Sequence, residues 1–191
     1  MMLPRLIATL SIIVWLFPPI RQFKGKFFFY FLILALLDPL LELIHLFIHL
    51  NPIEFYSIGN LLLIISLLSF SKLQKYMGYL ILITIITTWL SFSLGIREVI
   101  MIIILEHLVI LIFLLRVTLL DINDNRHINL FYIILDFYIL SIIFKFFGTL
   151  IDLRFGLFYF YITSAFEILI GTFFILYNEK NSPKVKLRFT N

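Results

Sequence analysis

The chain of 191 residues contains no cysteine. Disulfides, thiolate nucleophiles, iron–sulfur clusters and cysteine-ligated zinc are therefore excluded. Charge is also scarce, because only 14% of the residues are charged, against about a quarter in soluble domains. Apolar residues make up 62% of the chain, and the mean hydropathy is +1.10. This balance excludes a soluble domain and indicates an integral membrane protein.

Small residues are rare as well. The chain has three alanines and seven glycines beside 23 phenylalanines, and no two glycines stand in a Gly-x-x-x-Gly pair. That pair is the usual means by which membrane helices approach each other closely. We therefore expect helices packed by large side chains, without close glycine-mediated crossings.

Catalytic signatures are missing. The sequence has no Gly-x-Ser-x-Gly elbow, phosphate-binding loop, dinucleotide fingerprint, kinase motif set or His-Glu-x-x-His zinc motif. The last apolar block contains no lysine, which excludes a retinal Schiff base at its usual position. These absences favour a protein that is not an enzyme.

Seven apolar blocks have the length of a membrane-spanning helix, which is roughly 17–25 residues. They cover residues 4–20, 27–50, 53–70, 76–95, 96–120, 128–147 and 155–178. Pro18-Pro19, Asn51-Pro52, Gly95 and Gly148 separate several of them, as helix-ending residues do. The predicted fold is all-α: a polytopic bundle of seven transmembrane helices as one domain, 1–178, followed by a short basic tail, 179–191.

The basic residues predict the orientation, because they concentrate on the cytoplasmic side of membrane proteins. With the N-terminus outside, eleven of the fifteen face the cytoplasm: Arg21, Lys24, Lys26, Lys72, Lys75, Arg116, Arg126, Lys180, Lys184, Lys186 and Arg188. We therefore expect the C-terminus in the cytoplasm. The default compartment is the inner (plasma) membrane of a bacterium, and an organelle membrane is the alternative.

The positive charge is modest, +4, and it is spread between apolar blocks. It favours contact with anionic lipid headgroups over nucleic acid. In the tail, we expect Lys180, Lys184, Lys186 and Arg188 to contact headgroups.

A stripe of ionisable residues follows the second predicted helix. Asp38, Glu42, His45 and His49 fall within an arc of about 60° of a helical wheel. Such residues are costly in hydrocarbon, so they usually face protein or a wet cavity. Pro39 lies within the stripe and deprives the carbonyl of Ala35 of its helical donor, which favours a kink.

Other predicted helices carry ionisable residues at comparable depths. Glu106 and His107 lie in the fifth, Asp136 in the sixth and Glu167 in the seventh. Together with the stripe they predict a polar pocket that opens on the outer side. For Asp136 and Glu167 we expect either an interhelical hydrogen bond or an ion pair with Lys145. Because adjacent helical residues point about 100° apart, only one of Glu106 and His107 is expected to face the pocket centre.

The histidines allow three interpretations. They could be neutral side chains that hydrogen-bond between helices, or groups that relay protons or recognise a ligand. His45 and His49 also have the i, i+4 spacing of two metal ligands, which Glu42, Glu106 or His107 would complete. We expect no cofactor, and a divalent metal at His45 and His49 is the alternative.

One segment has a family resemblance. Residues 15–26, Trp-Leu-Phe-Pro-Pro-Ile-Arg-Gln-Phe-Lys-Gly-Lys, resemble the end of a first helix in the PQ-loop and sugar-transporter group. Seven spans with an outer N-terminus would suit that group. The proline–glutamine pair is absent, however, and the second half has no matching proline, so no residue role is carried over.

The expected function is that of a non-catalytic subunit, such as a sensor, adaptor or structural component, of a larger membrane assembly. Its partners would be the lipid bilayer and other membrane protein subunits. Two alternatives remain: a membrane-embedded metal-dependent hydrolase that uses the stripe, and a small solute or proton transporter.

Overall fold

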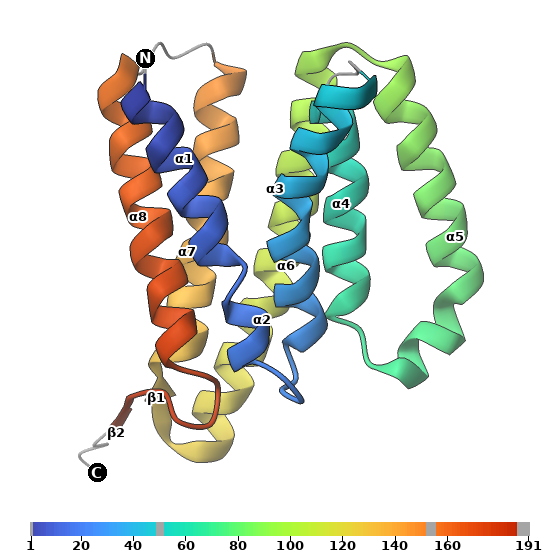
Figure 1. The fold of residues 1–191 in the computed structure, drawn as a ribbon. Helices are drawn as coiled ribbons and strands as arrows, with labels where there is room; N and C mark the ends of the chain where they lie inside the picture. Colours follow the sequence, from blue (N-terminus) through green and yellow to red (C-terminus); the bar gives the residue numbers. More distant parts are fainter. Residues whose placement is uncertain (1, 49–51, 152–155, 187–191) are drawn as a thin grey trace.

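The computed structural model describes residues 2–48, 52–151 and 156–186, and they form an all-α bundle (Figure 1). Its helices are α1 (Met2–Trp15), α2 (Pro18–Arg21), α3 (Phe28–Ile48), α4 (Pro52–Ser66), α5 (Phe70–Ser93), α6 (Ile96–Asn125), α7 (Leu130–Leu150) and α8 (Gly156–Leu176). Two short strands, β1 (His127–Asn129) and β2 (Lys184–Lys186), pair antiparallel at one end of the bundle. We call this the sheet end, and the end at which α1 begins the far end.

Within the described residues, three helices are long and apolar enough to cross a membrane: Ser71–Ser93, Ile96–Asn125 and Leu130–Leu150. The all-α prediction is confirmed, and these helices mark a membrane protein. In contrast, α1 has 14 residues and α4 has 15, fewer than a bilayer core requires.

Helix boundaries differ from the predicted blocks where local chemistry decides them. The first block, 4–20, breaks after Trp15, because Pro18 has no N–H and starts the separate helix α2. The fifth block was expected to end at residue 120, but α6 continues through its polar last turn to Asn125. It stops there because Arg126 adopts the left-handed conformation, with φ at 55°.

The C-terminal segment folds back onto the sheet end. The Asn129 side chain caps α7 by accepting from the Phe131 N–H at 3.1 Å, and its Nδ2 donates to the Glu179 carbonyl at 2.8 Å. The buried Gln22 donates to the carbonyls of Tyr177 and Phe174 at 2.9 and 3.3 Å, which satisfies the last turn of α8. Thus β2 and the residues before it are tied to two other loops.

Aromatic side chains form much of the core near the sheet end. The ring centroids of Phe31, Phe131 and Phe174 lie 4.8 to 6.1 Å apart, and all three side chains are fully buried. Phe27 and Tyr30 are buried too. The aromatic run at 27–30 is therefore divided between core and surface, because Phe29 is exposed.

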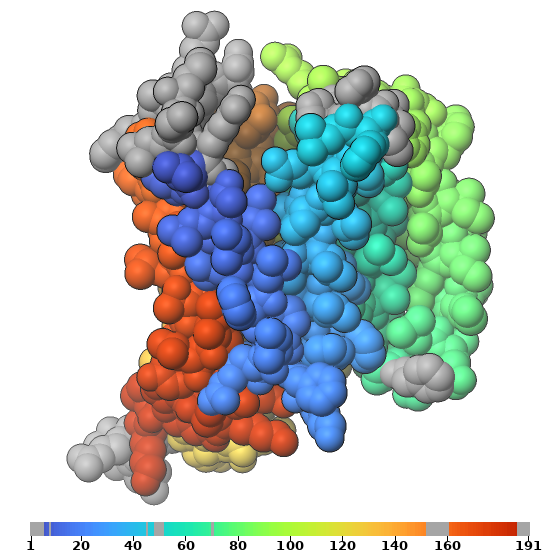
Figure 2. Space-filling view, viewed as in Figure 1, coloured from blue at the N-terminus to red at the C-terminus, as the bar shows by residue number. Residues whose placement is uncertain are grey.

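Helix α5 lies at one edge of the bundle, beside α4 (Figure 1 and Figure 2). Only 6% of its most apolar window is buried, against 39% in α6 and in α7. Most of its large side chains are exposed, and Trp89 is 66% exposed.

Two glycines do lie at close helix crossings, contrary to our expectation. A Cβ at Gly59 in α4 would collide with the Leu37 side chain of α3. A Cβ at Gly171 in α8 would lie 2.7 Å from Val14 Cγ1 and 3.4 Å from Trp15 Nε1 of α1. Each glycine therefore works singly, as a notch for one large side chain.

Gly171→Ala should destabilise the protein by about 1–3 kcal/mol, because the stiff β-branched Val14 must move to admit the methyl group. Gly78→Ala in α5 is the matched control, since no atom lies within 4 Å of its Cβ position. Alanine there should be neutral or stabilise by up to about 1 kcal/mol. Unfolding by SDS titration in mixed micelles measures both, and equal stabilities would contradict the close crossing.

Candidate functional site

A cavity of about 110 Å³ lies between α1, α3, α4, α7 and α8, and we call it the polar pocket. It is lined by Ser11, Trp15, Leu34, Asp38, Tyr56, Tyr138, Ile142, Lys145, Phe146 and Glu167. The pocket thus brings together Asp38 and Glu167, two of the ionisable residues that the sequence analysis singled out, with Lys145.

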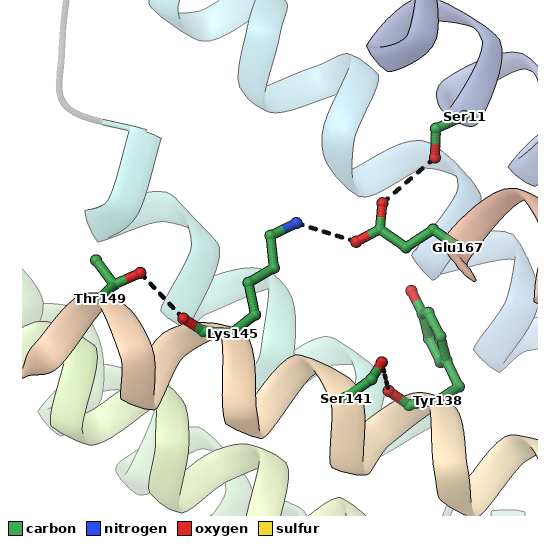
Figure 3. A network of polar contacts seen from close by, with 6 residues as sticks. All are labelled: Ser11, Tyr138, Ser141, Lys145, Thr149 and Glu167. Carbon is green, nitrogen blue, oxygen red and sulfur yellow. Dashed lines mark hydrogen bonds and ion pairs between the residues drawn. The ribbon is translucent and has the colours of Figure 1, made fainter. Parts of the chain in front are cut away.

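An ion pair crosses the pocket from α7 to α8 (Figure 3). Lys145 Nζ lies 3.0 Å from Glu167 Oε1, and Ser11 Oγ of α1 donates to Glu167 Oε2 at 3.4 Å. The predicted pairing of Lys145 with a carboxylate is confirmed for Glu167. The Glu167 carboxylate of α8 thus contacts side chains of both α7 and α1.

Asp38 is the second carboxylate among the described residues that line the pocket. Among the residues that the structure describes, none donates a hydrogen bond to its carboxylate or forms an ion pair with it. Two carboxyl groups and one ammonium group therefore share the pocket, and the ammonium group is already engaged by Glu167. The carboxylate of Asp38 is therefore the acidic group of the described lining that has no ion-pair partner.

Aromatic rings form the walls beside this carboxylate. Trp15 and Tyr138 lie 4.5 Å apart between ring centroids, and Tyr56 and Phe146 lie 5.2 Å apart. Aromatic faces attract cations and repel anions. A carboxylate in a pocket lined by four aromatic rings can attract a small organic cation.

Glu106 and His107 belong to a different cluster, between α4 and α6. Glu106 accepts from Ser57 Oγ at 3.0 Å and from Asn60 Nδ2 at 3.3 Å. His107 Nδ1 lies 3.3 Å from the same Asn60 nitrogen and 2.8 Å from the Ile103 carbonyl. All four side chains are buried, and neither Glu106 nor His107 lines the polar pocket, although one of them was expected to face its centre.

This second cluster supports the wall of the polar pocket. The His107 ring stacks on Tyr56, with centroids 6.2 Å apart and an angle of 18°, and lies 5.8 Å from Phe146. His107 therefore holds two wall residues from behind without lining the pocket itself.

The remaining predicted site residues do not join the pocket. Asp136 accepts from Thr118 Oγ1 at 2.7 Å, which is a hydrogen bond between α7 and α6. Glu42 is exposed, and Lys180, Lys184 and Lys186 are exposed near the sheet. The side chain of His45, and His49 and Arg188 altogether, lie outside the described residues.

The metal hypothesis stays a prediction. Among the described residues, no group of three or more histidine, aspartate or glutamate side chains could hold a metal ion. The side chains of His45 and His49, on which the hypothesis rests, lie outside the described part of the structure.

Ser11 and the four aromatic wall residues were not predicted from the sequence to line the pocket. Tyrosine is common at membrane interfaces, but Tyr138 stands well inside a predicted span. A buried phenol at that depth was a usable signal for a polar neighbourhood. Trp15 and Phe146 carried no signal, because aromatic residues occur throughout this chain.

Removing one member of the ion pair should lower the free energy of unfolding more than removing both members. Lys145→Met leaves Glu167 with a single donor, Ser11, whereas the double change Lys145→Met with Glu167→Gln removes the unpaired charge. We expect a coupling energy of about 0.5–2 kcal/mol between the two positions. The double-mutant cycle is measured by SDS unfolding, and strictly additive effects would show that the pair does not stabilise the bundle.

The chain matches no protein-family model, and comparison with curated proteins and with solved structures found no match.

Proposed function

We propose that this protein is a seven-span membrane protein and the sensor subunit of a larger membrane assembly, in which the polar pocket binds a small organic cation. The N-terminus lies outside and the C-terminus in the cytoplasm. The membrane is the inner (plasma) membrane of a bacterium. The observation that carries the proposal is the unpartnered carboxylate of Asp38 among four aromatic rings.

The charge distribution supports this orientation. Basic side chains lie towards the sheet end in the α2–α3 connection, the start of α5, the last turns of α6 and the segment after α8. Arg97 and Lys145 are the described basic side chains towards the far end. The positive-inside rule then assigns the sheet end to the cytoplasm. Asp38 and Lys145 accordingly face the outer half of the membrane.

The pocket also limits the ligand. Its volume of about 110 Å³ admits a molecule of a few non-hydrogen atoms. A protonated alkylamine can donate to the Asp38 carboxylate while its carbon atoms contact the ring faces. A small anion would meet two carboxylates and the negative faces of the rings, so it is disfavoured.

Helix α5 supports the subunit part of the proposal. It is the least buried of the three long apolar helices, at 6% of its most apolar window. Its contacts within the bundle leave most of its surface open, which suits packing against a transmembrane helix of another protein. Cation binding at the pocket is then reported to the partner through helix contacts and not through a reaction.

Tryptophan fluorescence tests the binding site directly. The chain has two tryptophans, Trp15 in the pocket wall and the exposed Trp89 of α5. In a Trp89→Phe variant the emission reports only on Trp15. Methylammonium and ethylammonium chloride should change this emission saturably in lipid nanodiscs, whereas sodium acetate should not. No saturable change with any alkylammonium ion would overturn the proposed ligand class.

Native mass spectrometry tests the subunit role. The tagged protein is extracted gently from its own membranes and weighed with whatever remains bound. A second polypeptide at fixed stoichiometry is the expected result, and it should be lost when Ile85 and Trp89 on the exposed face of α5 are replaced by charged residues. A lone chain would overturn the subunit role without touching the pocket.

A transporter is the second candidate, for one reason. Helices α1, α7 and α8 lie on one side of the bundle, and α3 and α4 lie beside them (Figure 1). The residues that line the pocket come from both groups, and solute sites in transporters lie between such groups of helices. Uptake of labelled methylamine into proteoliposomes would favour transport. Binding without uptake would favour the sensor.

A further inference from the structure

A second, larger cavity opens at the sheet end, with a volume of about 320 Å³. We call it the basic cavity. The α2–α3 connection, the end of α4, the α4–α5 connection, the start of α5 and α6 form its walls. They contribute Lys26, Ser66, Leu67, Leu68, Ser69, Lys72, Phe113, Arg116, Val117 and Leu120.

Three cations line this cavity without an acidic counterpart. They are Lys26, Lys72 and Arg116, and none of the described lining residues is a carboxylate. The ion pair that the described part of the chain contains, Lys145 with Glu167, belongs to the polar pocket. Three like charges around one cavity repel each other unless an anion lies between them.

Uncharged donors add to this preference for an anion. Ser69 precedes α5 as its N-cap without a side-chain hydrogen bond to the helix, so backbone N–H groups of the first turn are left to other acceptors. Such a helix start favours negative charge. The Ser69 hydroxyl lies 3.3 Å from that of Ser71 and lines the cavity.

The rest of the wall is apolar. Leu67, Leu68, Phe113, Val117 and Leu120 line the cavity between the basic residues. Leu120 is 51% exposed on the outside of α6. The cavity therefore offers cations and an apolar surface side by side, which is the pattern of a basic lipid pocket between membrane helices.

We propose that the basic cavity binds an anionic phospholipid of the cytoplasmic leaflet. Lys26, Lys72 and Arg116 hold its phosphate, and its acyl chain lies along Phe113, Val117 and Leu120. Phosphatidylglycerol fits because its headgroup carries a net negative charge. Phosphatidylcholine fits poorly, because its trimethylammonium group would add a fourth cation.

Binding of defined lipids tests the proposal. The delipidated protein is titrated with phosphatidylglycerol or phosphatidylcholine, and the bound lipids are counted by native mass spectrometry. Phosphatidylglycerol should bind at one preferred site, at least tenfold tighter than phosphatidylcholine. The pair Lys72→Gln with Arg116→Gln should weaken this binding by roughly 25-fold, about fivefold for each cation removed.

The matched control is Lys24→Gln with Lys75→Gln. It removes the same charge from neighbouring segments at the same end, outside the basic cavity. Lys24 and Lys75 lie over the rings of Phe23 and Tyr76, as Lys26 of the cavity lies over the ring of Phe27. If the control weakens binding as much as the cavity pair, or if both lipids bind equally, the lipid acts as a diffuse counterion and the proposed site is wrong.

A last experiment distinguishes the phosphate of a lipid from a soluble phosphate ligand. Inorganic phosphate and glycerol 3-phosphate, each at millimolar concentration, should leave phosphatidylglycerol bound, because they lack the acyl chain. Displacement by either would overturn the lipid in favour of a soluble phosphate ligand. The inference uses only the membrane placement of the sheet end and not the ligand of Asp38, so it stands or fails separately from the alkylammonium measurement.

Discussion

Asp38→Asn should abolish most alkylammonium binding to the Trp89→Phe protein, raising the dissociation constant by about 10–100-fold. The carboxylate is the only acidic group of the described pocket wall that lacks an ion-pair partner, because Glu167 is engaged by Lys145. A hydrogen bond to a charged group contributes about 1.5–3 kcal/mol, which corresponds to this range. The amide keeps the shape of the side chain, so the loss reports charge and not packing.

Glu42→Gln is the matched control for this measurement. Glu42 lies one helical turn after Asp38 on α3, but it is exposed and does not line the polar pocket. Binding should be unchanged within a factor of two. If Glu42→Gln weakens binding as strongly as Asp38→Asn, the charge of the helix attracts the ligand in general, and Asp38 is not its partner.

The sequence predicted that Asp38 lies in a pocket, but not what surrounds it. Helical periodicity gives the angle of a side chain around its own axis, and from this it grouped Asp38 with Glu42. In the structure the two side chains have different surroundings, because Asp38 lines the cavity and Glu42 is exposed. Which neighbours fill the other side depends on how α1, α7 and α8 pack, and no single helix carries that information.

The partners of ionisable side chains were easier to predict from the sequence than the packing of the helices. Lys145 and Glu167 were expected to find ion-pair partners across helices, because an unpaired charge in hydrocarbon is costly, and they pair with each other at 3.0 Å. Asp136 likewise has a polar partner on another helix, because it accepts a hydrogen bond from the Thr118 hydroxyl. Glu106 and His107 were harder to interpret, because their shared partner Asn60 is 46 residues away in the chain.

Apolar residues gave the least guidance. The sequence could not separate Phe27, which is 2% exposed, from Phe29, which is 64% exposed. In a soluble protein, polar residues mark the outer face of a helix, but here the outer face is apolar as well. Buried and lipid-facing phenylalanines therefore look alike in sequence, and only packing distinguishes them.

Among the substitutions considered, we expect the largest loss of stability when the Phe131 side chain is removed. This side chain is fully buried, and its ring lies 5.3 Å from Phe174 and 6.1 Å from Phe31. Phe131→Ala should destabilise the protein by about 3 kcal/mol, the lower end of the range for phenylalanine in soluble cores. We expect the lower end because lipid is as apolar as the protein core. The substitution therefore removes contacts between rings, but it removes no free energy of transfer from water.

Phe137→Ala provides the comparison on the same helix, because Phe137 is 57% exposed. If α7 turns this ring to lipid, its removal should change the free energy of unfolding by less than about 0.5 kcal/mol in SDS titration. A cost near 3 kcal/mol at Phe137 would mean that another protein covers this face. A small cost at Phe131 would mean that the ring cluster of Phe31, Phe131 and Phe174 does not hold α3, α7 and α8 together. The pair of variants thus distinguishes core from lipid-facing surface, which the sequence cannot do.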